Sequence, residues 1–193
     1  MIAERHYRML LVSSGEQFIR EIGALLQGSL YQTDNSRSAS DARGKLLEKR
    51  YDIVIVNAPL SDESGWRLCI DASRNNGTIV GLFAASDSFD EMYARTSVQG
   101  VFVIHKPLSR NMVSQALSLM VCARERLRTV EKKAVKAESK LDEIRVVNKA
   151  KWMLIEHEGF SEAEAHHYVE KAAMDAGITK KLAAQIIIDS YLH

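Results

Sequence analysis

The stretch that decides the fold of the first half of the chain is DIVIVNAPLSDESG, residues 52–65. Four apolar residues, 53–56, run without a polar break into Asn57, and a proline and a polar loop follow. A short continuous apolar run is typical of a parallel strand that is buried on both faces of its sheet. Open α/β sheets place their functional side chains just beyond the carboxyl ends of such strands. Here that position holds a neutral amide.

The run 53–56 is one of five apolar runs that alternate with helix-period stretches in the first half of the chain. Strands and helices that alternate in this way predict a parallel sheet with right-handed crossovers. The predicted strands are 9–12, a weaker one at 30–33, 53–56, 79–83 and 101–104.

Two motifs connect this half to a known family. HKPLS, residues 105–109, places Lys106-Pro107 after the fifth predicted strand, and residues 51–65 fit a third strand with the loop after it. In these positions the chain resembles the receiver domain of response regulators, over about residues 7–120. The resemblance implies a flavodoxin-like, five-stranded parallel sheet of order 2-1-3-4-5. We assign residues 1–115 to this receiver-like domain.

The chain departs from the family pattern where the phosphoryl chemistry resides. The family carries its phosphorylatable Asp where Asn57 stands, a pair of acids where Ser13 and Ser14 stand, and Ser or Thr near Ala84. Phosphoryl transfer needs a carboxylate and a Mg²⁺ ion held by oxygen anions. Only Lys106 remains of that set, so we expect a degenerate phosphoacceptor site that is not phosphorylated.

Two alternatives concern the same loop. In the first, Ser61 or Asp62 replaces the missing acceptor, but both stand further along the loop and have no metal site beside them. Lys106 is expected to be either a surface lysine or one that holds the Asn57 loop by a hydrogen bond.

A heptad pattern occupies residues 116–144. Apolar residues recur there at alternating spacings of four and three, and no Gly or Pro occurs between Arg110 and Glu158. This pattern predicts a long helix with a coiled-coil seam, whose main members are Met120, Leu127, Val130, Leu141 and Ile144. The competing interpretation is a long helix that packs on its own receiver-like domain.

Charges beside the seam favour a parallel homodimer. In such a dimer Arg126 would face Glu131, and Lys133 would face Glu138, which are both attractive pairs. A third pair, Lys140 with Arg145, would repel. Exposed pairs of this kind contribute only a few tenths of a kcal/mol each, so they indicate orientation more than affinity.

The last segment, residues 145–193, reads as three helices. Gly159 ends the first, and Ser161 with Glu164 forms a capping box at the start of the second. Gly177 ends the second helix, and Thr179 can cap the third.

This segment resembles the ANTAR domain, an RNA-binding module of transcription antiterminators. The matching residues are Asn148, Ala150-Lys151, Leu154-Ile155, Gly159, Ser161, Glu164-Ala165, Tyr168, Lys171, Ala173-Met174-Asp175, Leu182-Ala183 and Ile186-Ile187. The resemblance implies binding of hairpins in a leader transcript, which blocks formation of a terminator.

The segment is not basic overall, but its cations are grouped away from the acids of residues 156–164, and a local patch can hold phosphates. The candidate RNA-binding residues are Asn148, Lys149, Lys151, Lys171, Met174, Lys180 and Lys181. For Tyr168 and Met174, packing in the core of the three helices is the competing interpretation.

The overall composition sets the remaining bounds. The net charge of +1 gives no general attraction to nucleic acid, and the two cysteines form no disulfide framework. The sequence predicts a cytoplasmic regulator without a membrane span, metal site or cofactor, and not an enzyme. Two other functions stay open: a DNA-binding regulator that uses the three helices as a helix-turn-helix, and a scaffold that binds a signalling partner protein.

Overall fold

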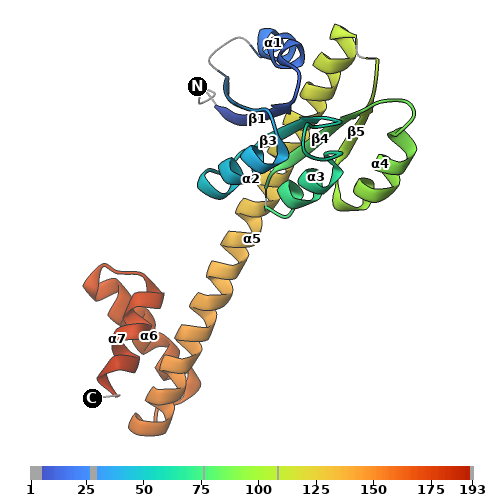
Figure 1. Ribbon diagram of the computed structural model, residues 1–193. Coiled ribbons are helices and arrows are strands. Elements are labelled where there is room, and N and C mark those ends of the chain that lie inside the picture. The colour runs from blue at the N-terminus through green and yellow to red at the C-terminus, as the bar shows by residue number, and fades with distance from the viewer. Residues whose placement is uncertain (1–5, 27–29, 76, 108, 192–193) are drawn as a thin grey trace. The chain divides into compact units, whose positions relative to one another are not determined.

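The computed structural model describes residues 6–26, 30–75, 77–107 and 109–191, drawn in Figure 1. The chain forms two compact units, and the division between them falls between Thr129 and Val130. We call them the N-terminal unit and the C-terminal unit. The predicted divisions after residues 115 and 144 both fall inside one helix, α5 (Arg110–Glu158), which contributes to both units.

The N-terminal unit is built on a five-stranded parallel sheet. Its strand order is β2-β1-β3-β4-β5, which confirms the order predicted from the resemblance. The strands are β1 (Tyr7–Ser13), β2 (Tyr31–Ser36), β3 (Ile53–Asn57), β4 (Ile79–Ala84) and β5 (Phe102–His105). The edge strand β2 extends beyond its predicted end because its sequence, YQTDNS, is largely polar and lies at the border of the sheet.

Helices cover both faces of this sheet (Figure 1). Alternate strand residues such as Leu10 and Val54 pack against α2 (Ala39–Glu48), α3 (Trp66–Ser73) and α4 (Phe89–Thr96). The residues between them, such as Met9 and Ile55, pack against α1 (Glu16–Leu25) and the first part of α5. A short 3₁₀ helix, Ser97–Gln99, precedes β5.

Met120 corrects the predicted seam. It is 0% exposed and belongs to the hydrophobic core between α5 and the sheet. Its side chain fills the space that Gly81 leaves on β4, since a Cβ at Gly81 would lie 2.3 Å from Met120 Cε. Leu127 is half-buried and packs against the same core. The first part of α5 therefore follows the competing interpretation, a helix that packs on its own domain.

The C-terminal unit packs the second part of α5 against α6 (Glu162–Ala176) and α7 (Lys180–Ser190). Its core is formed by Ala150, Leu154, Ala165, Val169, Ala184, Ile187 and Ile188. The predicted capping box is confirmed: Ser161 Oγ accepts from the Glu164 N–H, and the Glu164 carboxylate accepts from the Ser161 N–H. Gly177 ends α6 with a φ of 62°, and Thr179 caps α7.

Candidate nucleic-acid interface and the carboxyl edge of the sheet

At the carboxyl edge of the sheet, Asn57 and Ser13 bind each other. They are register partners on β3 and β1, and Asn57 Nδ2 donates to Ser13 Oγ over 2.9 Å. The buried Ser13 hydroxyl in turn donates to the Gly15 carbonyl over 3.0 Å. Ser14 is exposed. These neutral side chains provide no anionic oxygen for a metal ion, which agrees with the reading of a degenerate site.

Lys106 closes the same edge. Its Nζ donates to the Ala58 carbonyl, and its backbone N–H donates to the carbonyl of the buried Ala84 over 2.9 Å. Of the two alternatives for Lys106, a surface lysine or one that holds the Asn57 loop, the structure shows the second. Partial burial lowers the pKa of the Lys106 ammonium.

Asp62 has a structural partner instead of a metal site. Its two carboxylate oxygens accept from the N–H groups of Ala39 and Ser40, over 2.8 and 2.9 Å, at the start of α2. These backbone hydrogen bonds lower the pKa of the Asp62 carboxyl. A carboxylate in this position satisfies free helix donors. Ser61 donates to the Arg37 carbonyl over 3.3 Å.

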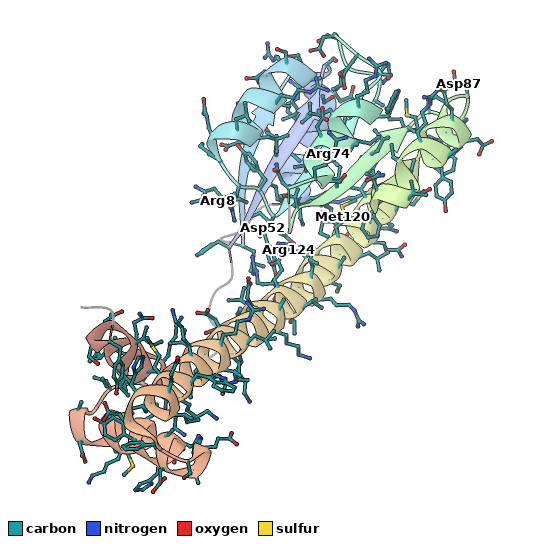
Figure 2. All side chains as sticks on the ribbon, turned by 90° about the horizontal axis from the view of Figure 1, so that it is seen from below. Arg8, Asp52, Arg74, Asp87, Met120 and Arg124 are labelled. Atoms are coloured by element: carbon teal, nitrogen blue, oxygen red, sulfur yellow. The ribbon has the colours of Figure 1, made fainter. Side chains whose placement is uncertain are left out.

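The opposite, amino-terminal edge of the sheet holds a mostly buried cluster of ion pairs. Asp52, just before β3, accepts at Oδ1 from Arg124 Nε over 2.9 Å and from Arg128 Nη2 over 2.8 Å. Its Oδ2 accepts from the Arg8 backbone N–H over 3.1 Å. Figure 2 shows Asp52 and Arg124 together at this end of the unit. The cluster fixes α5 to the sheet.

In the C-terminal unit, three of the predicted RNA-binding lysines have acidic partners. Lys151 Nζ lies 3.1 Å from Glu162, and its side chain is 14% exposed. Lys180 binds Glu170, and Lys181 binds Asp142. Lys180 lowers the pKa of Glu170, and Lys181 lowers the pKa of Asp142, in both cases mainly through the side-chain hydrogen bond. The expected separation of the cations from the acids of residues 156–164 is therefore wrong at Lys151, which binds Glu162. The two lysines of α7 are paired with acids outside that stretch, which come from other helices.

The remaining predicted residues are open to solvent. Lys149 and Lys171 are exposed, and within the described ranges neither makes an ion pair. Asn148 is exposed on α5. Met174 is exposed at the end of α6, beside a shallow hollow of about 390 Å³ that Lys180 also lines. The core interpretation of Met174 is therefore wrong.

The seam residues of the C-terminal unit are also exposed. Val130, Leu141 and Ile144 lie largely in solvent, unlike Met120 and Leu127. They lie on a different side of α5 from Ala150 and Leu154, which are buried in the core. This stripe is available to another molecule.

Two aromatic residues add to this picture. Tyr168, expected by one interpretation in the core, is half-exposed, and its ring packs edge-on against Phe160 at 5.8 Å. Trp152, which the sequence reading did not select, is strongly exposed on α5. The helical period could have revealed it, since Trp152 stands two residues from both Ala150 and Leu154, on the opposite side of the helix.

Among the described residues, no helix is long and apolar enough to cross a bilayer. No group of three or more His, Cys, Asp or Glu side chains in those same ranges is arranged to hold a metal ion.

Comparison with known proteins gives results for both units. Residues 136–188 match the ANTAR domain family. Transcriptional regulatory protein PdtaR of Mycobacterium tuberculosis (strain ATCC 25618 / H37Rv) is 24% identical over 186 residues, covering 95% of this chain and 90% of that protein. Adventurous-gliding motility protein Z of Myxococcus xanthus (strain DK1622) is 39% identical over 62 residues, which are 32% of this chain and only 4% of that protein.

Solved structures match the N-terminal unit. The signal receiver domain of an HD domain-containing protein from Pseudomonas fluorescens Pf-5 superposes with a TM-score of 0.58 at 23% identity, covering 67% of this chain and 96% of that one. The signal receiver domain of a putative Luxo repressor protein from Vibrio parahaemolyticus gives 0.57 at 19% identity, covering 65% and 98%. These likenesses establish the receiver fold. The receiver fold, the ANTAR match that follows it and the similarity to PdtaR over nearly the whole chain together support an ANTAR response regulator with a receiver domain.

Proposed function

We propose that the protein binds hairpins in leader transcripts through its C-terminal unit and thereby prevents formation of a terminator. The observation that carries this proposal is the ANTAR match at residues 136–188, on a unit whose α5 and α6 expose Lys149 and Lys171 without ion pairs among the described residues. Free cations of this kind can contact phosphates without first giving up a carboxylate.

The paired lysines have a different part in this proposal. Lys151, Lys180 and Lys181 must exchange an acidic partner for a phosphate before they contact RNA. We therefore expect Lys149 and Lys171 to contribute more to the salt dependence of binding than the three paired lysines.

The first test is RNA binding over a range of salt concentrations. The probe is a pool of RNAs with two adjacent hairpins and randomised loops, measured with the unchanged protein and with Lys149→Ala/Lys171→Ala. Each lysine that contacts a phosphate contributes about one unit to the slope of log affinity against log salt, so the variant should lose up to about two. Lys132→Ala is the matched control, because Lys132 is an exposed lysine of α5 outside the proposed set.

Two results would contradict the proposal. If the unchanged protein retains no RNA from the pool, RNA binding itself is contradicted. Equal slopes for the double variant and the unchanged protein would remove Lys149 and Lys171 from the interface. A transcription assay on a template with a terminator then tests antitermination, and we expect more read-through when the protein is present.

A DNA-binding role has less support. A recognition helix in the major groove needs polar and basic side chains on its outer face. The outer face of α7 instead exposes Leu182 and Ile186, and its two lysines are both engaged with carboxylates. We expect duplex DNA to compete poorly with the RNA pool.

The proposal includes a parallel homodimer and a receiver that is not phosphorylated. The exposed stripe of Val130, Leu141 and Ile144 gives a second copy an apolar surface, and the pair Lys133 with Glu138 would attract across a parallel dimer. Asn57, Ser13 and Ser14 leave the receiver without acceptor or metal ligands. Control of RNA binding would then come from a partner protein or another signal.

A further inference from the structure

Trp152 is the most conspicuous side chain of the C-terminal unit that the proposed interface does not yet use. It is 70% exposed. The other aromatic rings in the described part of this unit are engaged: Phe160 packs against Tyr168, and Tyr191 stacks on His157 at 4.9 Å. In the same ranges the indole ring of Trp152 has no ring or cation contact.

The exposed neighbours of Trp152 on the helix surface are polar or charged, while a further neighbour, Ile155, is partly buried against the core. Residues three and four positions apart on a helix lie side by side, which places Lys149 and Asn148 next to the indole on one side. Both are exposed, and Lys149 makes no ion pair within the described residues. Glu156 stands four residues beyond Trp152 and marks the acidic end of this surface.

The packed helix fixes the backbone from which this side chain projects. Ala150 and Leu154 are buried against α6 and α7, and Trp152 is turned away from both by roughly 200° of helix rotation. A tryptophan has only two side-chain torsions to fix on binding, so it offers a large flat contact area at a low conformational-entropy cost.

We propose that Trp152 is a base-stacking platform, on which an unpaired loop base of the RNA lies against the indole while Lys149 contacts the adjacent phosphate and Asn148 the base edge. This inference rests on the proposed RNA binding and adds a specific contact to it. Base-specific recognition of RNA is made largely to unpaired loop bases that stack on aromatic side chains. Such stacking tolerates any base, because every base has a π-face.

The competing occupant of this surface is a second copy of α5. The seam argues against it, because its last aliphatic members are Leu141 and Ile144, and the next two seam positions hold Asn148 and Lys151. Trp152 thus stands beyond the apolar part of the seam, among polar neighbours. A lone aromatic ring beside a free lysine and an amide fits a nucleotide better than an aliphatic helix face.

The test uses fluorescence in the full chain. The sequence has two tryptophans, so Trp66→Phe leaves Trp152 as the only indole. We expect its emission to be quenched when the two-hairpin RNA pool is added, and not when the same stems are added without unpaired loops. Unchanged emission on binding of the loop-containing RNA would overturn the inference.

Affinity measurements complete the test. Stacking contributes about 1–3 kcal/mol per base, so Trp152→Leu should weaken binding of the pool by roughly 5- to 150-fold, while Trp152→Phe retains most of it. Val135→Ala is the control, since Val135 is equally exposed on another side of α5 and should leave binding unchanged.

The remaining outcomes separate this inference from the proposed function. If the unchanged protein retains no RNA, RNA binding itself fails and the stacking role fails with it. If it binds and Trp152→Leu binds equally well, only the stacking role is wrong. If Trp152→Leu dissociates a dimer in sedimentation, Trp152 is a contact between copies and the inference is overturned.

Discussion

The two stretches of α5 have the same periodicity and different environments. Up to Thr129, the helix belongs to the N-terminal unit and turns Val113, Leu117 and Met120 into the core against the sheet. From Val130 on, the heptad positions continue, but Leu141 is 57% exposed where Met120, at the equivalent position, is fully buried. The same apolar pattern is therefore buried in an intramolecular core in the first stretch and exposed to solvent in the second.

The difference shows what a heptad pattern contains. It establishes that one side of a helix is apolar, because side chains three and four residues apart share a face. It contains no information about what covers that face. The N-terminal stretch is covered by β4 and its neighbours, and Gly81 provides the room for Met120.

The largest expected effect is that of Met120→Ala. Removing a fully buried methionine leaves a cavity and should lower the free energy of unfolding of the N-terminal unit by about 2–5 kcal/mol. Urea titration followed by the fluorescence of Trp66, in a Trp152→Leu background, measures this unit alone. Leu119→Ala is the control on the same stretch, because Leu119 is largely exposed and should cost little. Equal effects of the two substitutions would contradict the burial of Met120.

The reverse behaviour is expected at Leu141. Leu141→Lys should leave both units folded but weaken self-association by about 2 kcal/mol, roughly thirtyfold, because it loses apolar contact and brings like charges together. Sedimentation equilibrium over a range of concentrations measures this. Val135→Lys adds the same charge away from the stripe and should have no effect. A dimer that tolerates Leu141→Lys would show that the stripe is not its interface.

Much of the fold could be predicted because it depends on local signals. Buried parallel strands gave apolar runs, and the capping box at Ser161 depends on residues only three positions apart. Elements at the border were predicted less well, since the edge strand β2 has no apolar run to mark its end. Met120 was misassigned because its cover, Gly81, is distant in sequence.

The candidate site was less predictable for the same reason. The absence of acidic residues at the carboxyl ends of β1 and β3 could be predicted from the sequence, because it depends only on which residues follow each strand. The partners of the lysines could not, because Lys181 and Asp142 lie 39 residues apart and meet only through packing of the helices. The ion cluster of Asp52 could not be predicted either, since its partners Arg124 and Arg128 follow more than 70 residues later.

The next effect in size concerns this cluster, which fastens the first stretch of α5. Asp52→Ala removes the carboxylate that both Arg124 and Arg128 contact, and Arg124 is only 12% exposed. Loss of one partner from a mostly buried pair should lower the free energy of unfolding of the N-terminal unit by about 2 kcal/mol. The urea titration with Trp66 measures it. An effect no larger than that of Glu91→Ala would show that the cluster contributes little, since Glu91 is in an exposed pair with Arg95.

The smallest expected effect is none, and it tests whether the receiver fold keeps any switching chemistry. Asn57→Asp restores the family's acceptor, but Ser13 and Ser14 still supply no charge to hold Mg²⁺. We expect no labelling of this variant by radioactive acetyl phosphate with Mg²⁺ present. The comparison is the triple variant Asn57→Asp/Ser13→Asp/Ser14→Asp, which restores the acids and should take up label.

Labelling of the single variant would show that a metal can bind without those acids. Label in neither variant would mean that the loops themselves, tied by Lys106 to the Ala58 carbonyl, no longer admit a phosphoryl group. In the expected case the N-terminal unit anchors the first stretch of α5 without a phosphorylation switch, and regulation must act elsewhere on the chain.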